Sequence, residues 1–192
     1  MFARTERLLL RPSWIEDAPA LAEAIGDEAI VRNLATAPWP YGLAEAKAFV
    51  TTKRQPRETS LLVFRRTHRA AQLIGSVGFE RSADGEIELG YWISRPHWGL
   101  GYATEAAGAM VALARHSLRL KRLSASHFLD NPASGRVLEK IGFRASGIIE
   151  PRHSAGRGGT APSKLYTLSL DAEPAEAEDV AAMACGDQMV AA

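Results

Sequence analysis

The stretch of sequence that decides the fold is EIELGYWISRPHWGLGYATEA, residues 86–106. It begins as a strand, passes through a turn with two glycines, and runs directly into a long amphipathic helix expected over residues 103–118. Gly99 and Gly101 remove side chains that would block a ligand, and the free N–H groups at a helix start attract an anion. These residues therefore predict a phosphate-binding turn.

Two nucleotide-binding motifs fit this turn poorly. The dinucleotide-binding motif requires a third glycine where this chain has Thr104, and it follows a strand of a parallel unit. The triphosphate-binding loop requires Gly-Lys-Ser/Thr after four spacer residues, which the stretch lacks. A plain glycine turn that packs helix against strand remains an alternative.

The flanking sequence predicts an α+β fold with a mixed, mostly antiparallel central sheet flanked by helices. Strands are expected over residues 5–11, 61–66, 72–80, 86–93 and 122–128, and near 143–149 and 164–170. Helices are expected as two short segments within 17–34 with a break at Gly26, and over 43–53, 103–118 and 132–141. Pro38 and Pro40 make residues 37–42 irregular. An antiparallel meander followed by one β-α-β crossover argues against a doubly wound parallel sheet.

Charge is divided unevenly along the 192 residues. All 23 Lys and Arg residues and 16 of the 22 acidic residues precede residue 171, so residues 1–170 carry +7 and residues 171–192 carry −6. We expect one domain over 1–170 and a disordered, acidic, Ala-rich tail over 171–192. The overall charge of +1 argues against a protein that coats nucleic acid.

Cysteine usage and the N-terminus indicate a cytoplasmic protein. Cys185 is the only cysteine, so the chain forms no internal disulfide and residues 1–170 offer no thiol nucleophile. The first apolar run, Leu8 to Leu10, is much shorter than the core of a signal peptide, and no stretch has the roughly 20 apolar residues of a membrane span.

Four motifs resemble the GNAT superfamily of N-acetyltransferases, in the branch that acetylates ribosomal-protein N-termini. They are TERLLLRP (5–12), ELGYWI (88–93), WGLGYATEA (98–106) and NPASGRVLEKIGF (131–143). The resemblance covers residues 5–170 and implies that the sheet is splayed between its fourth and fifth strands, with acetyl-CoA in the gap. The residues it assigns to the cofactor are Tyr91, Trp92, Ile93, Trp98, Gly99, Leu100, Gly101, Tyr102, Ala103, Thr104, Asn131 and Ser134. Pro96 is consistent with this gap, because it ends the strand and leaves backbone groups of its neighbour for a pantetheine arm.

The predicted chemistry is direct attack of an amine on the thioester, because residues 1–170 contain no cysteine for an acyl-enzyme. The resemblance assigns Glu88 as a base acting through a water, with a solvated strand carboxylate as the alternative. It assigns Asn131 a hydrogen bond to pantetheine and Ser134 the protonation of the thiolate. The alternatives are a helix N-cap for Asn131, and Tyr91 or a water in place of Ser134 as the proton donor, with Tyr91 otherwise a core residue.

Acceptor binding is predicted for Trp39 and Tyr41, with Glu88, and for a loop over residues 151–162. A hydrophobic plug under the helices is the alternative for the two aromatic residues. Ser163 departs from the branch, which commonly has an aspartate before the last strand, so the resemblance does not fix the acceptor. The five histidines lack metal-site spacing, which predicts no metal, and His97 is expected at the surface.

The sequence thus predicts an acetyl-CoA-dependent N-acetyltransferase whose acceptor is a protein N-terminus. The alternatives are a small-molecule amine (polyamine, amino acid or antibiotic) as acceptor, and a non-catalytic acyl-CoA-binding module. We expect no nucleic-acid or membrane partner, and the choice between a monomer and a homodimer stays open.

Overall fold

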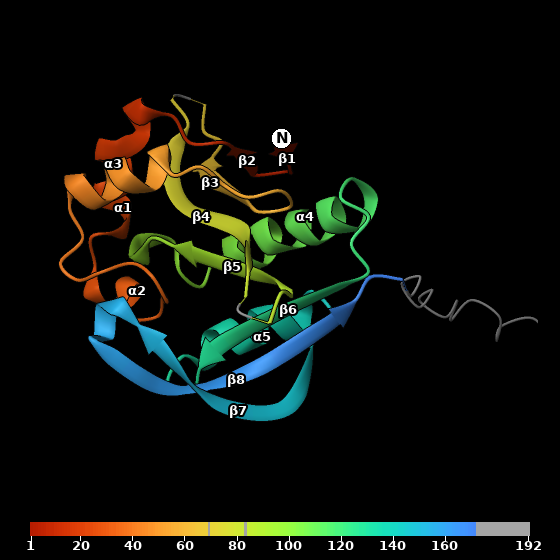
Figure 1. Cartoon of the computed structure of the whole chain (residues 1–192). Coiled ribbons are helices and arrows are strands. Elements are labelled where there is room, and N and C mark those ends of the chain that lie inside the picture. The colour runs from red at the N-terminus through yellow and green to blue at the C-terminus, as the bar shows by residue number, and fades with distance from the viewer. Residues whose placement is uncertain (69, 83, 172–192) are drawn as a thin grey trace, which may run out of the picture.

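The computed structural model describes residues 1–68, 70–82 and 84–171. Over these residues the chain forms an eight-stranded sheet with helices on both faces (Figure 1). The strand order is β1-β2-β3-β4-β5-β6-β8-β7, and β5 and β6 are the parallel pair in an otherwise antiparallel sheet. The predicted α+β fold is confirmed. Apart from Asp171, the predicted tail lies outside the described residues, as does Cys185.

The bounds of the elements follow the predicted order. The strands are β1 (Ala3–Arg4), β2 (Leu8–Arg11), β3 (Thr59–Arg65), β4 (Gln72–Arg81), β5 (Ile87–Ile93), β6 (Arg122–Phe128), β7 (Arg144–Ser154) and β8 (Gly159–Ser169). The helices are α1 (Ala18–Ile25), α2 (Glu28–Val31), α3 (Leu43–Thr51), α4 (Tyr102–His116) and α5 (Pro132–Lys140), with 3-10 turns η1 (Ile15–Asp17), η2 (Arg95–His97) and η3 (Ala155–Arg157). Among the described helices, none is long and apolar enough to cross a bilayer.

The sheet separates two apolar layers because successive side chains of a strand point to opposite faces. On β3, Leu61 and Val63 pack in the larger cluster with α4 and α5, whereas Leu62 and Phe64 pack against α1 and α3. A third, smaller cluster lies under α2. Helices α4 and α5 therefore cover one face, and α1, α2 and α3 cover the other (Figure 1).

The sheet opens between β5 and β6, as the resemblance implies for the fourth and fifth strands. Their register contains a single partner pair, Glu88 with Ser124, although each strand has seven residues. Beyond this pair the two strands diverge, so the last residues of β5 have no neighbour on the β6 side. The opening leaves backbone groups of β5 without strand partners.

Two expectations about elements are wrong. Residues 5–11 are not one strand: the Thr5 N–H donates to Leu8 O (3.0 Å), which closes a tight turn between β1 and β2. Residues 151–162 are not a loop, because β7 and β8 continue through them, with Pro151 opposite Pro162 and Ser154 opposite Gly159. Pairing between the two strands extends this hairpin to η3, although the prolines disfavour a strand prediction there.

The hairpin tip folds onto the segment that follows α2. The Ala155 N–H donates to Ala35 O (2.9 Å), and the buried Ser154 hydroxyl donates to Leu34 O (2.7 Å). A Cβ on Gly156 would lie 2.6 Å from Val31 O, so this close approach requires glycine. The tip thereby joins the helical layer of α1–α3 to the far side of the gap.

Candidate active site

The turn before α4 offers a row of unpaired backbone donors. Gly99 and Gly101 have φ values of +74° and +79°, a left-handed conformation that favours glycine. Within the described chain, the N–H groups of residues 99–104 have no acceptor, and the first paired one is Glu105 N–H, which donates to Gly101 O (3.0 Å). Space above Gly99 is open. Unpaired donors at the positive end of a 15-residue helix fit a pyrophosphate.

Arg7, which the sequence analysis did not single out, secures this turn. Its guanidinium donates to Leu100 O (2.9 Å) and to Glu105 Oε2 (2.7 Å), and it lies 4.6 Å from the Tyr102 ring centroid. Burial opposes ionisation of Glu105, but hydrogen bonds from Thr5 and Arg7 outweigh it and lower the pKa of that carboxyl. The signal was present in the sequence, since Arg7 lies in the quoted motif 5–12.

The residues just before the turn are fixed to the end of β5. Trp98 is 47% exposed, yet its Nε1 donates to Ile93 O (2.6 Å), and Leu100 projects into solvent. The expectation that His97 lies at the surface is wrong, because it is 8% exposed and its Nδ1 pairs with the Ser94 hydroxyl (2.9 Å). Burial and then Arg65 lower the pKa of His97, so it is neutral and adds no charge to the turn.

The open edge of β5 leads from the turn into the gap. Ser94 N–H donates to Ile74 O on β4 (2.7 Å). In an antiparallel pair the backbone groups of successive residues point alternately toward the partner strand and away from it. The backbone groups of Trp92 therefore point to β4, and the backbone groups of Tyr91 and Ile93 point to the gap. The N–H and C=O of Tyr91 face the side where β6 has diverged. The Trp92 side chain packs in the clusters under α1–α3, on the face opposite Tyr91.

Two candidate proton donors lie in direct contact. The Tyr91 hydroxyl is 2.9 Å from Ser134 Oγ and also donates to Ser134 O (3.0 Å). Tyr91 packs on the main core as well, so its two predicted roles, donor and core residue, are compatible in this geometry. Burial raises the pKa of Tyr91 to about 12, against a smaller opposing effect of Ser134. The phenol is therefore protonated at neutral pH and able to donate.

Asn131 is not a side-chain cap of α5. It occupies the N-cap position, with φ −120° and ψ 62°, but its side chain accepts no hydrogen bond from the first turn. The reason is its backbone conformation, which differs from the extended one that capping residues adopt. Its amide makes no hydrogen bond to the described residues and is available to a ligand at the mouth of the gap.

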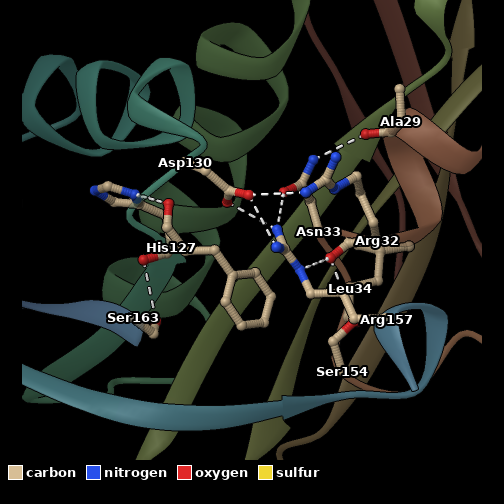
Figure 2. Close-up of polar contacts among 10 residues, drawn as sticks. Ala29, Arg32, Asn33, Leu34, His127, Asp130, Ser154, Arg157 and Ser163 are labelled. Atoms are coloured by element: carbon tan, nitrogen blue, oxygen red, sulfur yellow. Dashed lines mark hydrogen bonds and ion pairs between the residues drawn. The ribbon is translucent and has the colours of Figure 1, made fainter. Parts of the chain in front are cut away.

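A charged cluster holds the residue before Asn131 (Figure 2). Arg157 donates from both terminal nitrogens to the Asp130 carboxylate (2.8 Å each) and from Nε to Arg32 O (2.6 Å), and Arg32 reaches Asp130 Oδ2 at 2.9 Å. The Arg157 guanidinium also stacks over Phe128, 4.5 Å from the ring centroid. The hydrogen bonds from Arg157 lower the pKa of Asp130. This cluster ties α2, η3 and the start of α5 together around the gap.

On the face of α1–α3, Glu88 is engaged in an ion pair. Arg152 donates from Nη1 to Glu88 Oε1 (2.5 Å) and from Nη2 to Oε2 (2.8 Å), while the Ser126 hydroxyl donates to Oε1 (2.9 Å). The side chain of Glu88 is 19% exposed and ion-paired, so Glu88 is not the solvated strand carboxylate of the alternative interpretation. Its predicted position opposite Leu89 and Tyr91 is confirmed by the packing of those two residues on the α4 side. Arg152 was missed as an individual residue, although it lies in the segment 151–162 predicted for acceptor binding.

The two aromatic candidates for acceptor binding differ in environment. Tyr41 packs in both clusters under α1–α3, and burial raises its pKa to about 12, as expected of a hydrophobic plug. Trp39 is 41% exposed and adjoins the cis peptide bond to Pro40. Of the two, only Trp39 presents a free aromatic surface. Among the described residues, no three His, Cys, Asp or Glu side chains gather as a metal site.

Comparison with known proteins agrees with this geometry. The model of the acetyltransferase (GNAT) domain matches residues 7–144. The chain belongs to the GNAT acetyltransferase family. The uncharacterized N-acetyltransferase YoaA of Bacillus subtilis is 30% identical over 157 residues, which is 76% of this chain and 84% of YoaA. The ribosomal-protein-serine acetyltransferase of Escherichia coli is 31% identical over 81 residues, or 41% of this chain and 45% of that protein.

The GNAT fold is shared with a solved enzyme of the predicted branch. The structure of RimL, a ribosomal L7/L12 α-N-protein acetyltransferase in complex with coenzyme A, matches 90% of this chain and 100% of RimL with a TM-score of 0.74. The sequence identity is 18%, so the likeness concerns the GNAT fold alone. The predicted resemblance to ribosomal-protein acetyltransferases is confirmed at the level of family and fold.

Proposed function

We propose that this GNAT protein transfers an acetyl group from acetyl-CoA to a primary amine by direct attack in a ternary complex. The observation that carries the proposal is the row of unpaired N–H groups over residues 99–104, which leads into the β5–β6 gap. In the proposed complex the pyrophosphate binds these groups, and the pantetheine arm takes the free backbone of Tyr91 and the Asn131 amide. The positive charge of residues 1–170 favours a cofactor with several phosphate charges.

In the proposed reaction the amine nitrogen forms a bond to the thioester carbonyl carbon as the carbon–sulfur bond breaks. The amine loses one proton, through a water, to Glu88. The departing thiolate takes one proton from Ser134, whose hydroxyl lies 2.9 Å from that of Tyr91. Exchange with solvent then returns a proton to Ser134 and removes the one on Glu88. The products are the N-acetylated amine and free coenzyme A, with no acyl-enzyme.

Two classes of acceptor are candidates, protein N-termini and small-molecule amines. The E. coli relative and RimL are both acetyltransferases of ribosomal proteins, which supports a protein N-terminus as the acceptor. Small-molecule amines are the alternative acceptors. We propose that Trp39 and Glu88 contact the acceptor, and that Tyr41 supports this region from the apolar clusters under α1–α3.

The test is acetyl-CoA binding by calorimetry, followed by release of free thiol in the presence of N-terminal peptides, polyamines, amino acids and aminoglycosides. We expect binding, and thiol release with at least one class of amine. Binding without thiol release from any amine would instead support a non-catalytic acyl-CoA-binding module. Absence of binding at saturating acetyl-CoA would refute both.

A further inference from the structure

The proposed base, Glu88, forms an ion pair with a guanidinium from another strand. Arg152 on β7 donates to both oxygens of Glu88, and Oε1 also accepts from Ser126. A carboxylate oxygen has two lone pairs, so Oε1 is saturated and Oε2 keeps one free position. Both oxygens of Glu88 therefore become available to an acceptor amine only if Arg152 moves to another partner.

The pair is sheltered, which makes an unpaired charge there costly. The exposed fractions of the two side chains are 29% for Arg152 and 19% for Glu88. The hydrogen bonds that Arg152 donates to Glu88 raise the pKa of Arg152, and Glu150 and Asp84 add to that effect, so the guanidinium is a permanent cation. Separating such a pair without replacing each partner is strongly unfavourable. A ligand that enters must therefore supply an anion for Arg152 as well as an ammonium for Glu88.

There is room for a small ligand on the same face. Gly90 is two residues from Glu88 on β5, so both point to the face of α1–α3. Gly90 is exposed, and no atom lies within 4 Å of the position that a Cβ would occupy. Open space therefore lies over Gly90, beside Glu88 on the same face of β5.

We propose that the acceptor is an amino acid, or a small molecule in which a carboxylate lies within two or three bonds of the amine. This inference rests on the proposed acetyltransferase function and names its substrate class. The ligand carboxylate takes the two parallel hydrogen bonds of Arg152, and its ammonium faces the released Glu88 carboxylate across the water that relays the proton. Loss of a first proton to solvent frees the amine, and the proton lost during attack goes through this water to Glu88. Both protein charges keep a partner and the net charge of the site is unchanged, because a zwitterion replaces an ion pair.

The other acceptor classes meet this site less well. A polyamine brings only positive charge to a site that already holds Arg152, and it leaves the guanidinium without an anion. A peptide N-terminus has an amide carbonyl where an amino acid has its carboxylate, so it offers Arg152 a neutral acceptor. Arg152 is thereby a specificity-determining residue, and the feature it recognises is the negative charge beside the amine.

The test compares acceptors that differ only in that charge. A panel of L-amino acids and the matching amino acid amides is assayed for thiol release with acetyl-CoA, and for binding to the protein–CoA complex by calorimetry. We expect at least one amino acid to be used with a kcat/KM about tenfold or more above that of its amide. Equal use of each acid and its amide would overturn the inference while leaving the proposed function intact.

Variants of Arg152 separate specificity from folding. In Arg152→Gln the ratio of kcat/KM for the amino acid to kcat/KM for its amide should fall to about one, mainly through a rise in KM for the amino acid. Arg152→Lys keeps the charge but not the parallel hydrogen bonds, so an intermediate preference is expected. Arg144→Gln, at an exposed position of the same strand, is the matched control and should keep the original preference. A preference that survives in both Arg152 variants would contradict the inference.

The calorimetric arm keeps the two proposals distinguishable. If no amine releases thiol, the proposed function fails, and carboxylate-dependent binding lost in Arg152→Gln would still support the recognition role. If no amino acid binds to the protein–CoA complex, the recognition role is refuted whatever the outcome for other amines.

Discussion

The two sides of the β5–β6 gap are built in different ways. On the side of the turn before α4, the proposed binding groups are backbone N–H groups of the consecutive residues 99–104. On the side of α1–α3, they are side chains that come from β5, β6, β7, η3 and the segment after α2, joined in the Glu88–Arg152 and Asp130–Arg157 pairs. The first side depends on the shape of a turn, whereas the second depends on matched charges between distant segments. Substitutions on one side should therefore leave the other side's binding intact.

The largest expected effect separates turnover from cofactor binding. Glu88→Gln removes the proposed base, so kcat should fall by about 100- to 10,000-fold while the Kd of acetyl-CoA stays unchanged. Steady-state kinetics and calorimetry give the two values. Glu86→Gln, a more exposed carboxylate two residues earlier, is the control and should keep full turnover. A rise in the Kd of acetyl-CoA in Glu88→Gln would show that the two sides are not independent.

A negative charge in the turn before α4 should have the opposite effect, weakening the binding of acetyl-CoA. Gly101→Asp and Gly101→Asn both require a left-handed residue, which Asn and Asp tolerate similarly, and they differ only in charge. We expect the Asp variant to bind acetyl-CoA about 10- to 100-fold more weakly than the Asn variant, because its carboxylate adds negative charge to the turn proposed for the pyrophosphate and lies close enough to compete for Arg7, which is 3.4 Å from the Cβ position. Equal affinities in calorimetry would mean that the pyrophosphate binds elsewhere.

The third prediction concerns the hydroxyl pair inside the gap. Ser134→Ala and Tyr91→Phe should each lower kcat by about tenfold, and the double variant should be little worse than either, because the two hydroxyls act as a unit. Tyr166→Phe, a buried tyrosine whose hydroxyl donates to Glu139, is the control. Strictly multiplicative losses in the double variant would assign the two groups separate roles.

The smallest expected effect is on stability at low pH. Hydrogen bonds from Arg157 lower the pKa of Asp130 below the unfolded value of about 3.9. Its contribution is therefore present at neutral pH and is lost as the pH falls through about 4 toward the folded value. Because the Asp130 side chain is 49% exposed, screening limits the contribution to about 0.5–1 kcal/mol.

Urea unfolding at pH 7 and near pH 3 measures this contribution. Asp130→Asn should lower stability at pH 7 and lose part of the acid dependence, whereas Glu6→Gln, an exposed carboxylate, should behave as the original protein does. An Asp130→Asn protein with unchanged stability at both pH values would remove the cluster of Figure 2 from the forces that hold α2 and η3 together.

The elements were largely predictable because most of their signals are local. The meander, the break at Gly26, α4 and α5 follow from periodicity and from glycine and proline positions, and β6 was predicted with its observed bounds. The extension of the β7–β8 hairpin was not, because Pro151 and Pro162 favour a loop when each is considered alone. Pairing across the hairpin outweighs that local preference.

The sequence by itself determined the turn before α4, since a continuous stretch contains the strand, both glycines and the helix start. It also determined direct transfer as the expected chemistry, through the absence of cysteine from residues 1–170. Tertiary structure alone decided the surroundings of Glu88 and Asp130, because their partners are 64 and 27 residues away along the chain. Contacts of that separation depend on how the strands and the hairpin tip are arranged in space, which no local pattern encodes.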